Sequence, residues 1–450
     1  MSYDIVLASI PRMDYRGPYP APFMLKAYLE QHDFKCKAVD WNRDLYDKTN
    51  NKNIFLKSDV IFNSQTKFLE YWEKELKTIC SGWIDELKSY NSKWFGVSLV
   101  SQRNTNAAIK ILEMVRKELP DIKIVVGGHM IKNLTSNIGE NLKGRGLVDY
   151  FISGDGEESL LNLLRGNYDW PGINNNSGYK YVDLNQLPIA DYSDLDCSDY
   201  KLFYTYTSRG CVNRCKFCSD AMYTKTFKYR DHRLIVKEID YIFDKFGIRR
   251  YYFADCLING NPKEFRSLIE ALKGRNLRFD GMFLCNDWMT LQDWKNAADV
   301  GFKRLAPGFE TGCDRIRKEM GKSFTNETIF KTMEYTLEAG IIIEPQMIIG
   351  WPTETDEEFQ ETLDFITKLS TYKNLGVVNA GATLYLDENF PAYHIYGVKI
   401  DENGEWYYGN NTFDLRRKRW FKFVQHCKDL NVLVDEKHIE RIKGEIKDIV

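Results

Sequence analysis

Three closely spaced cysteines are the residues of this sequence whose types and positions could do chemistry. The segment TSRGCVNRCKFCSDAMY, residues 207–223, places Cys211, Cys215 and Cys218 in a C-x3-C-x2-C pattern. The other seven of the ten cysteines stand singly, as is typical of reduced, buried thiols. These seven are Cys36, Cys80, Cys197, Cys256, Cys285, Cys313 and Cys427. The segment at 211–218 is therefore the one that needs a special explanation.

A disulfide, a zinc ion and an iron-sulfur cluster are the groups that such cysteines could form or hold. Three is an odd number for disulfides, and a reducing compartment disfavours them. Structural zinc usually takes two close pairs of Cys or His ligands; His232 follows Cys218 by 14 residues, but no second close pair exists. Thiolates also ligate iron-sulfur clusters, where a cubane normally takes four. A cubane held by three leaves one iron open, which is a catalytic arrangement.

The composition narrows the classes of partner. Lys and Arg total 62 against 64 Asp and Glu, so the formal charge of -2 lacks the positive field that nucleic-acid binding usually needs. The start has no basic region followed by a long apolar run, and 18 apolar residues never run together. We therefore expect a cytoplasmic protein with a small-molecule substrate, no nucleic-acid partner and no membrane. At 450 residues the chain is long enough for two or three domains.

The first 165 residues alternate short apolar runs with amphipathic stretches, a pattern that predicts a doubly wound parallel sheet. Ligands of such sheets bind beyond the carboxyl ends of the strands. The unusual residues fall at those ends: the Pro- and Gly-bearing loop at 11–22, and two serines, two adjacent glycines and a Gly-rich loop further on. Those later positions are Ser98, Ser101, Gly127, Gly128 and residues 153–159.

Residues 166–200 are rich in Asn, Asp, Gly and Pro and are interpreted as an ordered connector. A second α/β series follows in residues 201–385, with strands expected at 201–209, 249–255, 278–286, 302–310, 341–350 and 375–385. Intervening helices end at Gly247, Gly301 and Gly340. Six β/α units predict a partial barrel, with the cysteines directly after its first strand. Residues 386–450 are expected to form an aromatic and helical C-terminal region.

The cysteine spacing, with the aromatic Phe217 just before the last cysteine, closely resembles the radical S-adenosylmethionine superfamily. The segments LNQLPIADYSDL, YYFADCLINGNP, PGFETGCDRIRKEMGK and MIIGWPTETDEEFQETL, together with PFMLKAYLE and VDYFISGDGEESL, resemble the subgroup with an N-terminal cobalamin (B12)-binding domain. The resemblance covers about residues 1–385. It implies an α/β fold: a Rossmann-like B12-binding-type domain, a partial (β/α)6 radical SAM barrel and a small helical C-terminal region.

The resemblance implies roles for particular residues. Cys211, Cys215 and Cys218 would ligate a 4Fe-4S cluster whose open iron binds S-adenosylmethionine, with Phe217 near the adenine. Asp255 would lie near the methionine moiety, and Glu310 and Thr311 near the ribose or amino-acid part, although Ser is commoner than Thr after that Glu. Backbone around Ile349 and Gly350 would contact adenine. Asp255 and Glu310 could instead be buried carboxylates satisfied by backbone donors.

Cobalamin is the second cofactor that the resemblance implies. The D-x-H-x-x-G motif, whose His binds cobalt, is absent around His32 and His129, yet the radical subgroup commonly lacks it. The lower face of the corrin ring would contact the 11–22 loop. The nucleotide tail of cobalamin would contact a set of serines and glycines. That set is Ser98, Ser101, Gly127, Gly128, Gly154 and Gly156. The alternative is a Rossmann-like domain without a cofactor.

The resulting hypothesis is a radical SAM enzyme that cleaves S-adenosylmethionine to a 5'-deoxyadenosyl radical. Cobalamin-dependent methyl transfer to an unactivated carbon or phosphorus of a small metabolite or natural product is the simplest reaction, with flavodoxin or ferredoxin as electron donor. A radical rearrangement or cyclisation, with or without cobalamin, is the alternative enzyme, and an iron-sulfur or zinc binding protein the alternative without catalysis. Methylthiolation is disfavoured because it needs a second three-cysteine set. No residue is assigned to the catalytic handling of the substrate.

Overall fold

The computed structural model describes residues 2–11, 13–55, 61–62, 64–132, 137–175, 181–220, 226–381, 383–436 and 442. The chain divides into two compact units, which meet in sequence between Tyr204 and Thr205. The expected boundaries at residues 165, 200 and 385 are finer than this division and stay predictions. No helix within the described ranges is both long enough and apolar enough to cross a membrane.

The first unit is built on a five-stranded sheet, as the alternating apolar runs predict. Its strands are β1 (Ile5–Ser9), β2 (Cys36–Asp40), β3 (Trp94–Ser98), β4 (Lys123–Gly127) and β5 (Tyr150–Phe151), in the order β2-β1-β3-β4-β5. Every neighbouring pair is parallel. The strand order reverses direction at β1, so the sheet is doubly wound, and the predicted fold of this part is confirmed.

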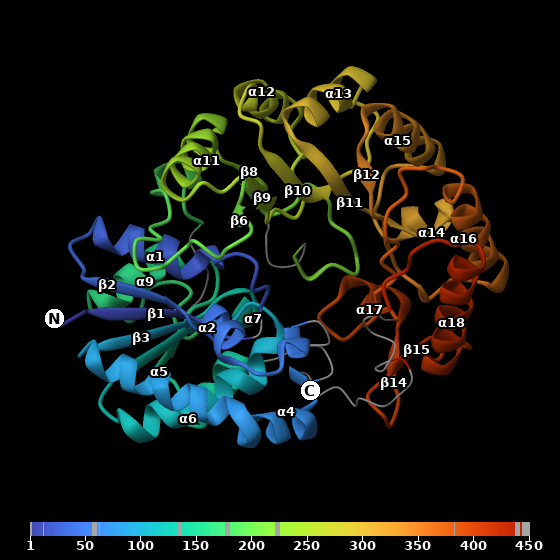
Figure 1. Cartoon of the computed structure of the whole chain (residues 1–450). Coiled ribbons are helices and arrows are strands. Elements are labelled where there is room, and N and C mark those ends of the chain that lie inside the picture. Colours follow the sequence, from blue (N-terminus) through green and yellow to red (C-terminus); the bar gives the residue numbers. More distant parts are fainter. Residues whose placement is uncertain are drawn as a thin grey trace. The chain divides into compact units, whose positions relative to one another are not determined.

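Helices cover both faces of this sheet (Figure 1). On one face α1 (Pro20–Glu30) contacts α9 (Gly156–Leu164); on the other α5 (Lys77–Ser89) contacts α2 (Trp41–Lys48) and α6 (Thr105–Glu118). The indoles of Trp41 and Trp83 stack between α2 and α5, with ring centroids 5.2 Å apart and an interplanar angle of 4°. The shorter helices are η1 (Lys52–Phe55), α4 (Gln65–Tyr71), the π-helical η2 (Trp72–Leu76), η3 (Gln102–Asn104), α7 (His129–Lys132), α8 (Ile138–Gly144) and η4 (Leu184–Gln186).

The described part of the connector at 166–200 packs on the first unit. The ammonium of Lys26 on α1 is 2.8 Å from carboxylate oxygens of both Asp191 and Asp194. The hydroxyl of Tyr200 donates a 2.8 Å hydrogen bond to Asp40 at the end of β2. These polar contacts tie the described part of the segment to α1 and β2, and its interpretation as a connector between domains stays a prediction.

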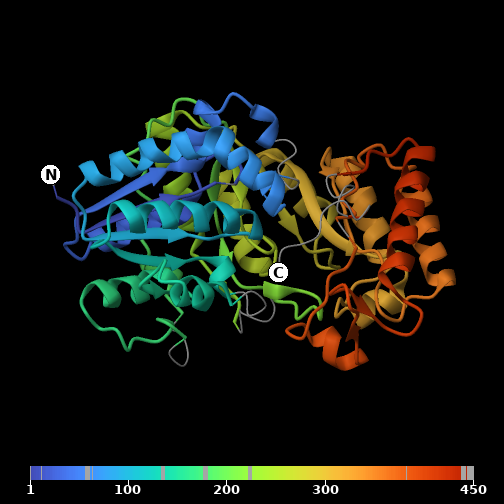
Figure 2. The same ribbon diagram turned by 90° about the horizontal axis from the view of Figure 1, so that it is seen from below.

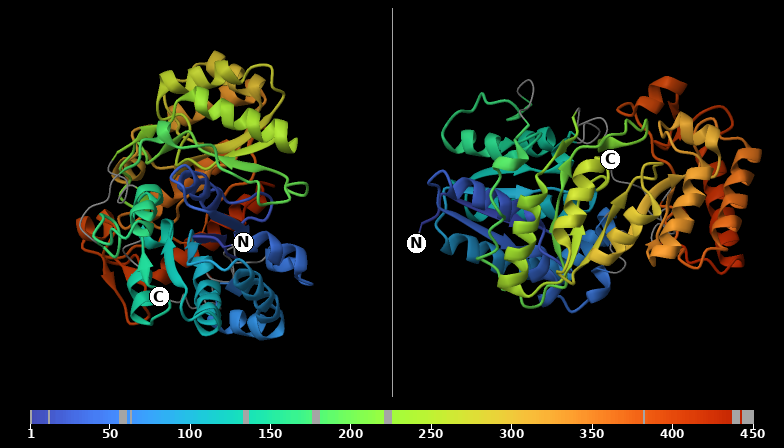
Figure 3. Two further views of the ribbon diagram at one scale, coloured as in Figure 1. Left: turned by 90° about the vertical axis from the view of Figure 1, so that its left-hand side faces the viewer. Right: turned by 90° about the horizontal axis from the view of Figure 1, so that it is seen from above.

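The second unit carries the strands of a partial barrel. They are β6 (Phe203–Thr205), which spans the division between the units, β9 (Arg250–Phe253), β10 (Arg278–Phe283), β11 (Phe302–Glu310) and β12 (Ile342–Ile343), in the order β12-β11-β10-β9-β6. The pairs from β9 to β12 are parallel. The outer helices are α11 (His232–Phe246), α12 (Pro262–Leu272), α13 (Leu291–Val300), α15 (Asn326–Ala339) and α16 (Asp356–Leu369). They cover one face of these strands (Figure 3).

Three expected strands differ from the observed ones. The strand expected at 201–209 is divided into β6 and a two-residue strand, Ser208–Arg209, which pairs outside the barrel sheet. The strand expected at 341–350 is split into β12 and β13 (Gln346–Met347), and β13 pairs with the end of β11 after a register shift. Pro345 stands at the break, where it has no N–H to donate to a ladder. Of the described residues in 375–385, Leu375 and Asn379 form isolated bridges to Ile343 and Gln346 rather than a strand.

The ends of the helices and the C-terminal residues complete the second unit. Gly247, Gly301 and Gly340 all adopt left-handed conformations at helix C-caps, which confirms the predicted stops. Beyond β13 the chain forms α17 (Pro391–Tyr396), a hairpin of β14 (Lys399–Ile400) and β15 (Trp406–Tyr407), and α18 (Phe413–Asp429). α18 lies alongside α16 (Figure 2).

Candidate functional site

The cysteine loop follows β6 and is anchored at several points of its backbone. A short antiparallel pair flanks it in the sequence, with β7 (Ser208–Arg209) before the cysteines and β8 (Lys228–Tyr229) after them. Lys216 donates its N–H to the carbonyl of Met320 at 3.0 Å, and its own carbonyl accepts from Ala392 at 3.1 Å. The loop is therefore held between the C-terminal end of α14 (Asp314–Glu319) and α17.

The three thiols are reduced and share one environment. Cys215 is buried, while Cys211 and Cys218 are half-buried. Burial raises the pKa of Cys215 to about 11; the charge of Lys322 opposes this rise, whereas those of Cys218 and Cys211 add to it. Burial likewise raises the pKa of Cys211, against an N–H from Asn213 and the charge of Lys322. The thiols thus act on one another, and a cation next to them favours their thiolate forms.

His232, the histidine that a zinc site would need, lies beside two carboxylate groups. The His232 Nδ1 atom lies 3.8 Å from Asp231 and 3.7 Å from Glu264. Within the described ranges, no three His, Cys, Asp or Glu side chains gather as ligands of a single metal ion. A cubane binds each thiolate at a different iron, so its ligands need not converge on one point. The site therefore fits a cluster better than one zinc ion.

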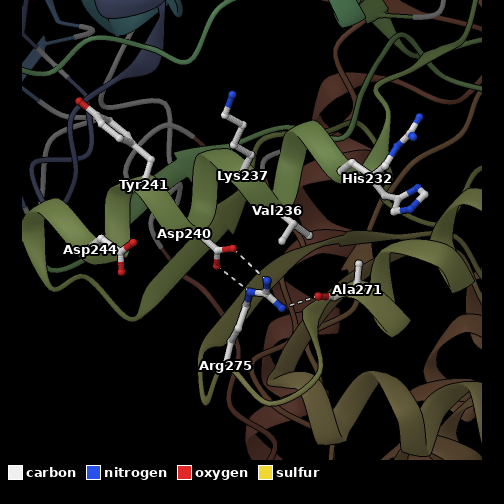
Figure 4. A pocket seen from close by; sticks show the side chains of 9 residues that line it. His232, Val236, Lys237, Asp240, Tyr241, Asp244, Ala271 and Arg275 are labelled. Carbon is white, nitrogen blue, oxygen red and sulfur yellow. Dashed lines mark hydrogen bonds and ion pairs between the residues drawn. The ribbon is translucent and has the colours of Figure 1, made fainter.

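His232 lines a groove of about 600 Å³ on the outer helices α11 and α12 (Figure 4). Arg275 lines this groove and donates hydrogen bonds of 2.6 and 2.9 Å to Asp240 on α11. Mixed charges line the groove, and none of the predicted cofactor-binding residues does. It is a surface feature between two helices and contributes nothing to the cysteine site.

Asp255, at the end of β9, is a buried carboxylate that accepts several hydrogen bonds. Its oxygens accept from the Thr207 N–H at 2.9 Å, the Thr207 hydroxyl at 2.7 Å and the Ser208 hydroxyl at 2.6 Å. Burial nevertheless raises its pKa to about 6. These bonds tie β9 to the strand that leads into the cysteine loop. They match the structural alternative for Asp255; its contact with S-adenosylmethionine stays a prediction.

Glu310 ends β11 in an uncommon backbone conformation. Its φ of 66° is in the left-handed region, and its carboxylate forms a 2.8 Å ion pair with the ammonium of Lys322. The side chains are only 8% and 11% exposed, respectively. A Cβ atom on Gly308 would lie 2.2 Å from the Glu310 carboxylate, so the absence of a side chain there makes room for the pair.

Thr311, Ile349 and Gly350 surround the end of β11 and β13 but are largely engaged with protein groups. The Thr311 hydroxyl is 3.0 Å from that of Thr362, and the residue is fully buried. The carbonyl of Ile349 accepts from Leu384 at 3.3 Å. A Cβ atom on Gly350 would meet the Arg416 side chain at 2.5 Å. The structure therefore leaves little of the predicted adenine and ribose contacts free; as ligand contacts these three stay predictions.

Phe217 is the aromatic residue of the loop, and it packs against a ring rather than projecting alone. Its ring centroid is 6.3 Å from that of Trp351 in a T-shaped arrangement. Trp351 directly follows Gly350 in the sequence. The two residues border an apolar group that includes Ile316, Met320 and Trp406. The structure thus brings Phe217 close to the chain at 349–351, which the resemblance assigned to the same adenine.

The residues predicted for cobalamin lie at the carboxyl ends of β3, β4 and β5 in the first unit. Ser98 and Gly127 end β3 and β4 and are register partners, and Ser101 caps η3. Gly128, with φ of 104°, must be glycine because a Cβ atom would lie 2.5 Å from the Leu99 carbonyl oxygen. The remaining two, Gly154 with φ of 95° and Gly156 at the start of α9, follow β5.

The same edge of the sheet carries a buried polar atom without a protein partner. The Ser9 hydroxyl, at the end of β1 and in register with Ser98, forms no hydrogen bond within the part of the chain described. The loop at 11–22 is anchored beside it: Met13 donates to Asn42 at 2.8 Å, and Tyr15 stacks on Tyr46 with centroids 3.8 Å apart. An unsatisfied hydroxyl beside glycine-lined backbone fits a ligand at this edge.

The sequence pattern does not identify three residues that lie near the cysteine loop or the loop after β3. Lys322 follows Gly321 in an ordinary helix stop. Cys256 looks like a single buried thiol, yet burial and the charges of Asp220, Cys211 and Cys218 all raise its pKa, so it lies near the cysteine loop. Asn104, fully buried, accepts from the N–H groups of Val100 and Ser101 and so fixes the loop after β3. Each depends on tertiary contacts that spacing does not encode.

The fold and the site together define a class: a parallel β/α partial barrel with three reduced thiols on a loop at the carboxyl ends of its strands. Residues 205–366 match the family model described as the radical SAM superfamily.

Solved structures share the fold of the chain across both units. A radical S-adenosylmethionine methyltransferase, TsrM, from Kitasatospora setae, bound to tryptophan and a SAM analog, has a TM-score of 0.69 at 16% identity and covers 95% of this chain and 89% of its own. The cobalamin-dependent S-adenosylmethionine radical enzyme OxsB, with aqua-cobalamin bound, has a TM-score of 0.68 at 16% identity. The match covers 98% of this chain and 70% of OxsB. At these identities the likeness concerns the fold.

Curated relatives match over shorter parts of their own length. A putative methylthiotransferase of Methanocaldococcus jannaschii is 26% identical over 346 residues, 70% of this chain and 66% of that protein. An uncharacterized methyltransferase of Pyrococcus horikoshii is 25% identical over 57% of this chain and 55% of that protein. The chain thus spans less than two thirds of the length of these relatives.

Proposed function

We propose that the chain is a radical SAM enzyme that transfers a methyl group, with cobalamin, to an unactivated carbon or phosphorus of a small metabolite or natural product. The observation that carries the proposal is the position of Cys211, Cys215 and Cys218 at the open end of a partial barrel in a superfamily defined by this chemistry. Flavodoxin or ferredoxin is proposed as the electron donor.

In this proposal the three thiolates hold a 4Fe-4S cluster. The cluster, once bound, supplies the electron that cleaves S-adenosylmethionine to methionine and a 5'-deoxyadenosyl radical. The protein contributes position and exclusion of water: the loop is anchored to Met320 and Ala392, and buried groups surround it. Phe217, packed on the fully buried Trp351, offers a ring surface to the adenine, and Glu310 with Lys322 offers charges to the amino-acid end.

The first unit is proposed to hold cobalamin at the carboxyl ends of β3, β4 and β5. Its support is the close backbone approach that Gly128 permits and the unsatisfied hydroxyl of Ser9. Several relatives of known or assigned activity are methyltransferases, including a bacteriochlorophyllide d C-12(1)-methyltransferase of Chlorobaculum tepidum, 27% identical over 35% of this chain and 36% of that protein. Bound cobalamin would carry a methyl group from a second S-adenosylmethionine, which leaves as S-adenosylhomocysteine, to the substrate from which the 5'-deoxyadenosyl radical has removed a hydrogen atom.

Methylthiolation is a weaker candidate even though some relatives carry that name. It needs a second set of three cysteines in the N-terminal part. Cys36 lies in β2 and Cys80 in α5, both buried in the first unit, and Cys197 stands alone in the connector. Separate buried thiols of this kind do not form a cluster site.

The test of radical chemistry starts with anaerobic purification and reconstitution of the full chain with iron and sulfide. After addition of S-adenosylmethionine and dithionite, we expect 5'-deoxyadenosine by chromatography. The triple variant Cys211→Ala, Cys215→Ala, Cys218→Ala should bind no cluster and form no product, because no other thiol can replace three ligands. Cys197→Ala, a single buried cysteine in the connector, is the matched control and should behave as the wild type.

Formation of 5'-deoxyadenosine at the same rate in the triple variant, or none in a cluster-loaded wild type, would overturn the enzyme proposal. A relative from Cereibacter sphaeroides that is named a cyclase supports the alternative of rearrangement or cyclisation; it is 23% identical over 57% of this chain and 46% of that protein. A second measurement separates this alternative from methyl transfer. With cobalamin added, S-adenosylhomocysteine should accompany 5'-deoxyadenosine if methyl transfer occurs. Deoxyadenosine without S-adenosylhomocysteine would favour the rearrangement.

A further inference from the structure

The ion pair between Lys322 and Glu310 is buried beside the cysteine loop, and the sequence pattern assigns nothing to Lys322. Its ammonium is 2.8 Å from the Glu310 carboxylate, and both side chains are about nine-tenths buried. A buried pair costs desolvation that its own attraction often fails to repay. A buried cation kept at such a cost points to a further negative charge nearby.

The turn that carries Lys322 packs on the cysteine loop through the neighbouring residue Gly321. A Cβ atom on Gly321 would lie 3.1 Å from the Arg214 carbonyl oxygen and 3.4 Å from the Cα atom of Cys215. The N–H of Lys216 reaches Met320 at 3.0 Å. The turn 320–322 therefore packs on the loop itself, so the charge of Lys322 acts on Cys215 and Cys211 as well as on Glu310.

Resting on the proposed function, we propose that Lys322 is a positioning residue whose positive charge sets the reduction potential of the cluster on Cys211, Cys215 and Cys218, and that Glu310 tempers it. A three-thiolate 4Fe-4S cluster is negative and becomes more negative when it accepts an electron. A fixed cation next to the thiolates stabilises the reduced state, and a fixed anion destabilises it. The pair thereby acts on the electron before S-adenosylmethionine is cleaved.

Two substitutions that remove charges of opposite sign give the proposal a signature. Lys322→Met keeps the length of the side chain and removes the cation, so the midpoint potential should become more negative. We expect the ratio of reduced to oxidised cluster at a fixed potential to fall about tenfold, about 59 mV for one electron. Glu310→Gln removes the anion while the negative cluster keeps Lys322 protonated, so the midpoint should become less negative.

The measurement is a redox titration of the reconstituted full chain without S-adenosylmethionine, followed by electron paramagnetic resonance. Lys322→Arg retains the charge and should restore a midpoint close to the wild type. Lys318→Met removes the same charge from the exposed face of α14 and is the matched control, with no shift expected. A purely packing role for Lys322 would shift both variants in the same direction, or neither.

Each outcome bears on one claim. A wild-type chain that assembles no cluster refutes the proposed function. A loaded Lys322→Met variant with an unchanged midpoint, or shifts of the same sign in Lys322→Met and Glu310→Gln, overturns the inference alone. Should Lys322→Met fail to take up iron, the Glu310→Gln arm decides: a less negative midpoint supports the inference, and no change or a more negative one refutes it.

Discussion

At the scale of single residues, three buried carboxyl groups carry raised pKa values. Burial raises the pKa of Asp40 to about 6, of Asp255 to about 6 and of Glu354 to about 7. Each keeps its place through donors: Tyr200 for Asp40, Thr207 for Asp255 and Arg419 for Glu354. Because the folded groups bind protons more readily than the unfolded ones, they make the fold less stable as the pH rises from about 4 towards 7.

The substitution Asp255→Asn is expected to lower the free energy of unfolding by an amount that depends on pH. The amide removes one oxygen acceptor from the Thr207 and Ser208 donors, which should cost about 1–3 kcal/mol at pH 5. Unfolded Asp is already ionised at pH 5, whereas the folded group titrates near 6. The wild type therefore loses about 1 kcal/mol from this group between pH 5 and 7.5, and Asn loses nothing. The gap between variant and wild type should narrow accordingly at pH 7.5.

Urea unfolding of the cluster-free full chain at the two pH values measures this gap. Asp244→Asn, on the exposed face of α11, is the control and should follow the wild type at both. A gap that widens with pH would show that Asp255 is held as a stabilised carboxylate, contrary to the expected sign.

The residues of the candidate site can be predicted from the sequence only where their spacing along the chain forms a motif. Cys211, Cys215 and Cys218 lie close together in the sequence, and the resemblance that their spacing carries predicts them as the ligands of a cluster. Lys322 is twelve residues from Glu310 in sequence, and its role arises from a turn that packs on the loop. No periodicity marks such a lysine, because charge compensation is a property of the folded interior.

At the scale of elements, the turn that ends α14 is the feature that positions the cysteine loop. Gly321 has φ of 91°, which favours glycine, and it also packs on the Arg214 carbonyl. Gly340, at the end of α15, has φ of 72° with open space around the position of a Cβ atom. The two glycines share the conformational demand and differ in their contact with the loop.

The substitution Gly321→Ala is therefore expected to act twice. The left-handed conformation alone should cost about 1–2 kcal/mol in Gly321→Ala and in the matched Gly340→Ala. Only Gly321→Ala should also displace the cysteine loop and lower the iron retained after reconstitution. Thermal melting and iron content per chain check the two effects, and equal iron content in both variants would contradict the positional role of the turn.

The strands differ in how far the sequence predicts them. The strands β9, β10 and β11 fall within their predicted ranges to within a few residues, although β10 contains Asp280 and β11 contains Pro307. The run at 341–350 contains Pro345, which has no donor for the ladder, so the strand breaks there. At 375–385, Gly376 lies against Ile342 and Glu344, and Gly381 has φ of 57°. Glycines weaken a strand, and only isolated bridges form.

At the scale of the whole molecule, the described residues 386–436 belong to the same unit as the barrel. The indole of Trp406 donates to the Leu384 carbonyl at 2.6 Å, and Asn411 donates to that of Trp351 at 2.7 Å. Arg416 is fully buried over the ring of Trp406, 3.6 Å from its centroid. These contacts fix the C-terminal hairpin and the start of α18 to the segments around Trp351 and Leu384.

A chain that ends after Leu386 should therefore lose the cooperative folding of its second unit. It would expose the apolar group around Trp351 and leave the Leu384 and Trp351 carbonyls without their donors. Thermal melting by circular dichroism and gel filtration check this, with the full chain as reference. A truncated chain that melts cooperatively and elutes as a monomer with native-like spectra would contradict it.

The stacked pair Trp41–Trp83 has an optical consequence. Two indoles held nearly parallel at 5.2 Å couple their excited states and give a paired circular dichroism band that a lone indole lacks. The pair lies in the first unit, whereas Trp351 and Trp406 lie in the second. Because a chain of two units need not unfold in one step, this band reports on the first unit alone. Loss of the band at a different denaturant concentration from the other signals would resolve the two stabilities within one intact chain.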